Sequence, residues 1–125
     1  MKLLLTAAVI AAAALAPAAY ADCSYPQAPS PIPDGNTATL AQMISTQKAV
    51  QAYNQQMNAY LSCIQLERDS RVASVGDKLT KQQKQELMAI EVQKHNAAVD
   101  QLHAVADQFN AQVKIFKAKD KKSND

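Results

Sequence analysis

Apolar residues recur at helical spacing in two long stretches of the chain. The first stretch, 37–75, contains neither proline nor glycine, and the second runs from 81 to about 117. Steps of three and four residues place successive apolar side chains on one side of a helix. The sequence therefore predicts an all-α fold, an antiparallel two-helix hairpin over 37–118 with its turn at about 76–80.

The first predicted helix carries two neighbouring stripes of residues, which implies two packing partners. We expect the second helix to cover one stripe and the segment before the helix to cover the other. A single broad face of an ordinary helix bundle is the alternative. The first stripe is Met43, Gln47, Val50, Asn54, Met57, Leu61 and Ile64, and the second is Thr46, Ala49, Tyr53, Gln56, Tyr60 and Cys63.

The second predicted helix has one regular stripe, with alternating steps of four and three residues. This spacing is typical of a helix that keeps one seam against a partner. His95 falls within the seam, so we expect a packed neutral imidazole there. The stripe is Met88, Val92, His95, Val99, Leu102, Ala106, Phe109, Val113 and Phe116.

Three positions are expected to mark the helix ends. Asn36 or Thr37 can cap the first helix, and Gly76 can end it in a left-handed conformation. Thr80 and Gln83 have the spacing of a capping box, in which each side chain bonds the backbone N–H of the other residue.

Segment 22–36, the arm, is rich in proline, which excludes a regular helix and favours extended polyproline II geometry. In that geometry the path from Cys23 to Thr37 is about 43 Å, and the helical path from Thr37 to Cys63 is about 39 Å. The arm can therefore fold back along the first helix and bring the two cysteines together. We expect Tyr25, Pro26 and Pro29 of the arm to pack over Tyr53, Met57 and Tyr60.

The first 21 residues have the features of a cleavable signal peptide. Lys2 precedes an apolar run over 3–15, and Ala19 and Ala21 fit the small-residue rule for a cut after Ala21. The run is too short to cross a bilayer, so we expect no transmembrane segment after cleavage. These features predict a periplasmic or secreted protein.

Cys23 and Cys63 are the only cysteines of the chain. In an oxidising compartment a single intramolecular disulfide is the default, while free thiols or a bridge between two chains are the alternatives.

Charge excludes a general attraction to nucleic acid or to a membrane. The whole chain carries a net charge of +2, and loss of Lys2 leaves 12 basic against 11 acidic residues. We therefore expect no nucleic-acid partner. The segment 119–125 is predicted to be a disordered, lysine-rich tail, and binding of the lysines over 114–122 to an anionic surface is left open.

The arm and the first helix resemble a group of small secreted proteins from Gram-negative bacteria. The resemblance covers about 23–64. It implies an exported bacterial protein with Cys23 paired to Cys63, and it implies nothing about activity. The residues that carry it are Cys23-x-Tyr25-Pro26, Pro33-Asp34-Gly35, Met43, Val50, Tyr53, Met57 and Tyr60-Leu61-x-Cys63.

No catalytic motif occurs in the sequence. Glu91 and His95, and likewise His103 and Asp107, are four residues apart and could each offer two metal ligands. Zinc requires three or four ligands, and the two pairs lie some 12 Å apart along a helix. We expect no catalytic residues, no metal and no cofactor.

The sequence thus predicts a non-enzymatic helical hairpin that acts through protein–protein contacts in the cell envelope. Its partner would be an unidentified envelope protein or a second copy of the chain, as in a dimer. The alternative is a binder of a small apolar ligand or lipid, held in a groove between arm and helices that Tyr25, Tyr53, Met57 and Tyr60 would line.

Overall fold

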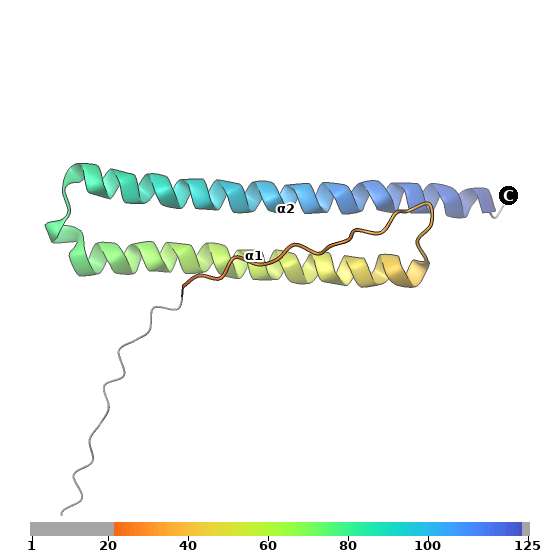
Figure 1. Ribbon diagram of the computed structural model, residues 1–125, viewed down its shortest axis with the longest axis horizontal. Helices are drawn as coiled ribbons and strands as arrows, with labels where there is room; N and C mark the ends of the chain where they lie inside the picture. Colours follow the sequence, from red (N-terminus) through yellow and green to blue (C-terminus); the bar gives the residue numbers. More distant parts are fainter. Residues whose placement is uncertain (1–21, 124–125) are drawn as a thin grey trace, which may run out of the picture.

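The computed structural model describes residues 22–123, which form two long antiparallel helices and an extended arm (Figure 1). Helix α1 spans Leu40–Val75, a short 3₁₀ helix η1 spans Gly76–Lys78, and α2 spans Lys81–Ser123. The predicted all-α hairpin is therefore confirmed. The predicted signal peptide and its cleavage site lie outside the described residues. Within 22–123, no helix is both long enough and apolar enough to cross a bilayer.

Helix α1 begins later than predicted, because residues 34–37 form a turn. The Asp34 carbonyl accepts hydrogen bonds from the N–H groups of Thr37 and Ala38, at 3.1 and 2.8 Å. Thr39 is the cap instead of Asn36 or Thr37. Its hydroxyl accepts from the Gln42 N–H at 3.2 Å, and the Gln42 side chain accepts from the Thr39 N–H at 2.8 Å. The first helix thus has a capping box of its own.

The turn between the helices differs from prediction at Gly76. This residue has φ −56° and ψ −36°, which is right-handed, so the expected left-handed cap is wrong. The chain continues into η1 at this point instead of reversing through one left-handed residue. The capping box of α2 is present as predicted. The Thr80 N–H donates to Gln83 Oε1 at 2.9 Å, and the Gln83 N–H donates to the Thr80 hydroxyl at 3.2 Å.

The arm lies along the groove between the two helices, and it is fixed at both of its ends (Figure 1). At one end, Cys23 and Cys63 form a disulfide with a Cα–Cα distance of 5.7 Å. At the other end, the Gly35 N–H donates to Gln112 Oε1 of α2 at 2.8 Å. The arm was expected to pack on the first helix alone, but it holds α1 and α2 together.

The buried core of the described chain coincides with the reach of the arm. Every buried apolar residue lies either within 38–64 or within 98–109, on the stretch that the arm covers. Past Ile64 and Ala98, two helices alone cannot enclose a side chain from all sides. The core residues are Ala38, Met43, Tyr53, Met57, Tyr60, Ile64, Ala98, Val105 and Phe109.

The predicted seam of α2 is correct near its end and wrong near its beginning. Phe109 is buried, but Met88, Val92 and His95 are all exposed. A straight helix drifts by about 20° for each seven-residue repeat, so three repeats rotate the stripe by about 60°. Leu87 turns inward in place of Met88, and it is only half-buried.

Helix α2 also continues to Ser123, past the expected boundary at 118. Lys119 explains part of this extension. Its ammonium donates to the Ala38 carbonyl at 2.9 Å and lies 4.8 Å from the centre of the Phe116 ring. The last turns of α2 are thus connected to the residues just before α1.

Gly35 permits a close approach between the arm and α2. A Cβ atom at this position would lie 2.2 Å from the Gln112 carbonyl oxygen and 2.8 Å from the Phe116 nitrogen, which are both backbone atoms. We expect Gly35→Ala to lower the free energy of unfolding by about 1 to 3 kcal/mol, as overpacking does. Equilibrium unfolding in urea measures the change.

Gly76→Ala is the matched control for this substitution. Its Cβ would lie 3.4 Å from a Val72 methyl group, which is an ordinary distance, on right-handed backbone. We expect it to be neutral or to stabilise the protein by up to about 1 kcal/mol. Equal destabilisation by the two alanines would contradict the close approach at Gly35.

Candidate functional site

The tyrosines predicted to join arm and helix lie together at the middle of the hairpin. The Tyr25 ring packs edge-on against Tyr60 of α1, with 5.0 Å between ring centroids and 74° between ring planes. Tyr53 and Met57 lie in the same core and are 2% and 0% exposed. Pro26 and Pro29 are half-buried. The face of the hairpin beneath the arm is therefore filled by the protein's own side chains.

This packing argues against the groove of the alternative reading. An apolar ligand lined by Tyr53 and Met57 would have to displace side chains that are already buried. Tyr53 lines a separate hollow between α1 and α2 that no arm residue borders. One hollow along the arm is open to solvent, and neither Tyr53 nor Met57 lines it. Its walls are Ser24, Pro26, Gln56, Ala59, Tyr60 and Cys63.

The Tyr53 hydroxyl is a buried polar atom that has no hydrogen-bond partner of good geometry among the described residues. Burial raises the pKa of Tyr53 above its ordinary value of 10.0, because the phenolate would be poorly solvated. Tyr25 adds a smaller contribution in the same direction. The folded protein therefore holds the phenolic proton more tightly than the unfolded chain does.

A raised pKa of this kind makes folding depend on alkaline pH. The contribution of Tyr53 is complete below its unfolded pKa and is lost as the pH rises through 10.0 and then through the higher folded value. We expect the free energy of unfolding to fall over this range. Tyr53→Phe should remove that part of the fall, because phenylalanine has no proton to lose. An identical alkaline decline in both proteins, measured by urea unfolding at several pH values, would contradict the assignment.

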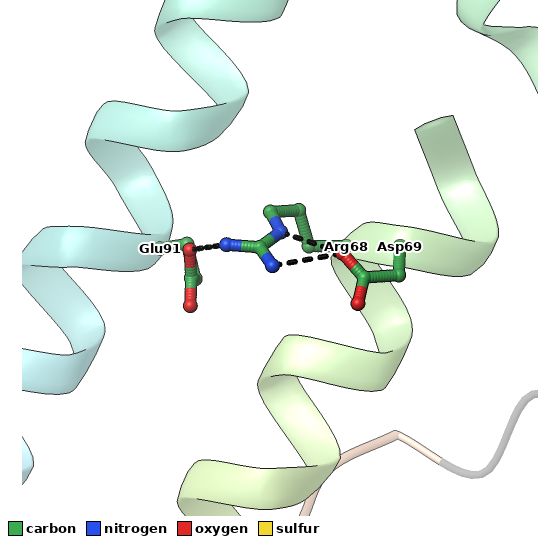
Figure 2. Close-up of polar contacts among 3 residues, drawn as sticks. All are labelled: Arg68, Asp69 and Glu91. Carbon is green, nitrogen blue, oxygen red and sulfur yellow. Dashed lines mark hydrogen bonds and ion pairs between the residues drawn. The ribbon is translucent and has the colours of Figure 1, made fainter. Parts of the chain in front are cut away.

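A salt bridge connects the helices where the core is absent. The Arg68 guanidinium of α1 binds the Glu91 carboxylate of α2, and it also binds Asp69 at 2.8 Å (Figure 2). The pKa of Arg68 is raised, mainly by the hydrogen bond to Asp69 and less by that to Glu91, while burial acts in the opposite direction. A third ion pair, between Arg71 and Glu67, lies on α1 at 3.5 Å.

Sequence reasoning missed this salt bridge because Glu91 was considered together with His95 of the same helix. The sequence signal that could have predicted the salt bridge is that a charged residue continues the apolar stripe of each helix. Arg68 is four residues after buried Ile64, and Glu91 is four residues after half-buried Leu87. Oppositely charged residues therefore continue the two facing stripes. No group of three or more potential metal ligands occurs among residues 22–123.

The half of the hairpin nearest the turn carries an unusual amount of exposed apolar surface. Six of the nine large apolar side chains that are exposed in the described chain lie here, although the region holds no buried apolar residue. Contiguous exposed apolar patches are a recognised mark of interaction sites, and Met88 and Val92, four residues apart on α2, share one face of that helix. We call this set the turn-half surface, and it consists of Leu66, Val72, Val75, Met88, Ile90 and Val92.

Comparisons of the chain with protein-family models, with curated proteins and with solved structures give no match. The resemblance to small secreted bacterial proteins therefore stays a prediction. The function has to be argued from the geometry of the turn-half surface and the arm.

Proposed function

We propose that this chain is an exported, non-enzymatic protein that acts through protein–protein contacts in the cell envelope. The observation that supports the proposal is the turn-half surface. Its six apolar side chains face solvent in the region that neither the arm nor a buried core stabilises. A protein partner that covered the face of α2 that carries Met88 and Val92 would bury apolar area that the hairpin cannot bury by itself.

The disulfide and the sequence pattern support the location. A bond between Cys23 and Cys63 persists in oxidising compartments, such as the bacterial periplasm or the extracellular medium. The partner is a second copy of the chain or another envelope protein. Either partner could cover the turn-half surface, and the crosslinking experiment below distinguishes a second copy from another protein.

Site-directed photo-crosslinking in producing cells tests the proposal. A photoreactive residue at Val92, which is exposed on α2, should give a defined adduct, and its mass identifies a dimer or a heterologous partner. Gln101 is the matched control, because it is also exposed on α2 but lies beside the arm-covered core. Met88→Ser should weaken the Val92 adduct. No adduct at Val92, or equal adducts at Val92 and Gln101, would refute a contact through this surface.

A further inference from the structure

The open end of the hairpin lies opposite the turn (Figure 1). Its surface chemistry differs from that of the turn. Helix α2 continues there to Ser123, so its last lysines have fixed positions on a helix. Lys114, Lys117 and Lys121 are three, four and seven residues apart, which places them on one face. All three are exposed.

Two exposed apolar side chains of α1 lie next to this lysine face. Leu40 is 62% exposed and Ile44 is 44% exposed. Both line a shallow hollow between the helices, and Lys117 of α2 lines the same hollow. Lys48 is exposed and lies four residues after Ile44, on the same face of α1. Lysines from both helices thus border an apolar centre. We call this set the basic end, and it consists of Leu40, Ile44, Lys48, Lys114, Lys117 and Lys121.

Acidic residues are scarce around the basic end. Residues 34–66 contain one acidic residue, Asp34, and residues 106–123 contain two, Asp107 and Asp120. The same two ranges contain six lysines, namely Lys48 and five on α2. Asp107 lies seven residues before Lys114 and marks the boundary of the basic face. The local charge is therefore strongly positive, although the chain as a whole is close to neutral.

We propose that the basic end docks onto the surface of an anionic lipid bilayer. Lysines near such a surface are attracted to lipid phosphates, and apolar side chains beside them can enter the boundary between headgroups and acyl chains. Nucleic acid fits the basic end less well, because it would leave Leu40 and Ile44 without a role. The basic end also has no arginine for phosphate forks, since Arg68 and Arg71 lie near the turn.

This inference is independent of the proposed function. The basic end and the turn-half surface lie at opposite ends of the hairpin (Figure 1). A protein held at a bilayer by its basic end could still present the turn-half surface to a partner. If bilayer docking through the basic end were lost, partner binding through the turn-half surface could still be measured, and the reverse also holds.

Vesicle co-sedimentation of the disulfide-bonded chain without residues 1–21 tests the docking. The vesicles contain phosphatidylglycerol and phosphatidylcholine in equal parts, and vesicles of phosphatidylcholine alone are the reference. We expect binding to the anionic vesicles that weakens with added salt. The triple variant Lys114→Gln, Lys117→Gln, Lys121→Gln should bind about a hundredfold more weakly, at roughly fivefold for each lysine.

A second triple variant supplies the matched control. Lys78→Gln, Lys81→Gln, Lys84→Gln removes the same charge from exposed positions near the turn and should bind like the parent protein. Equal loss in both triple variants would overturn the proposal, because net charge alone would then explain the binding. Equal binding to both vesicle compositions would overturn it as well.

The apolar centre distinguishes a bilayer from other occupants. Leu40→Ser with Ile44→Ser should weaken vesicle binding while leaving the helical circular dichroism spectrum unchanged, since both side chains are exposed. Unchanged vesicle binding together with retention of duplex DNA would overturn the bilayer in favour of a polyanion. A lower mass by light scattering for this variant, without lipid, would overturn it in favour of a second copy of the chain.

Discussion

Replacing Cys63 with alanine is expected to lower the free energy of unfolding by about 4 kcal/mol and to release the arm from the helices. The disulfide closes a loop across a sequence separation of 40, and the chain-entropy model assigns about that stabilisation to a loop of this length. Release of the arm should have a further effect, because the core exists only where the arm covers the hairpin. Residues such as Tyr60 would then lose a packing partner.

Chemical denaturation of the variant and the parent measures the loss. Cys23→Ala and the double variant should match Cys63→Ala, because each of them removes the same bond. Limited proteolysis gives a second readout, since the released arm should be cut between Cys23 and Gly35 before the helices are. Coincident unfolding midpoints and an uncut arm would show that the disulfide does not hold the arm in place.

Met57→Ala is expected to have an effect of similar size. Met57 is fully buried within the cluster formed by α1, α2 and the arm. Truncation of a buried methionine to alanine removes packed methylene groups and leaves a cavity, at a typical loss of about 2 to 5 kcal/mol. Equilibrium unfolding measures this loss directly.

Met88→Ala is the matched control, because it makes the same chemical change at a position that is 59% exposed. It should alter the free energy of unfolding by less than about 0.5 kcal/mol. A large loss at Met88 would mean that the seam of α2 follows the sequence pattern after all, and a small loss at Met57 would mean that the core beneath the arm contributes little to stability. The pair of variants therefore tests the rotation of the seam as well as the core.

The reach of the arm and the disulfide could be predicted from the sequence because both depend on fixed backbone dimensions. Polyproline II rises by about 3.1 Å per residue and an α-helix by 1.5 Å, so the two path lengths could be compared before any side chain was placed. The hydrogen bond from Gly35 to Gln112 could not be anticipated in this way. It depends on how closely the arm approaches α2. Neither the proline spacing of the arm nor the apolar stripe of the second helix determines that distance.

The phase of the α2 seam could not be predicted because it depends on supercoiling. A seven-residue repeat faces one partner throughout only if the helices wind around each other, and the straight helices of this hairpin let the stripe rotate outward. Met88 and Val92 were therefore assigned to the core, and the turn-half surface was missed. The same rotation turns Glu91 of α2 toward Arg68 of α1. The resulting salt bridge joins the two helices where the predicted apolar seam does not.

The hydrogen bonds that hold the start of α1 to α2 also determine when folding can finish. The bond between Gly35 and Gln112 joins residues 77 positions apart, and the bond between Lys119 and Ala38 joins residues 81 positions apart. The arm leaves the ribosome early, but the surface that receives it is complete only when nearly the whole chain has been made. Complete docking of the arm therefore requires nearly the whole chain, and a chain that stopped short of Gln112 would lack the acceptor for Gly35.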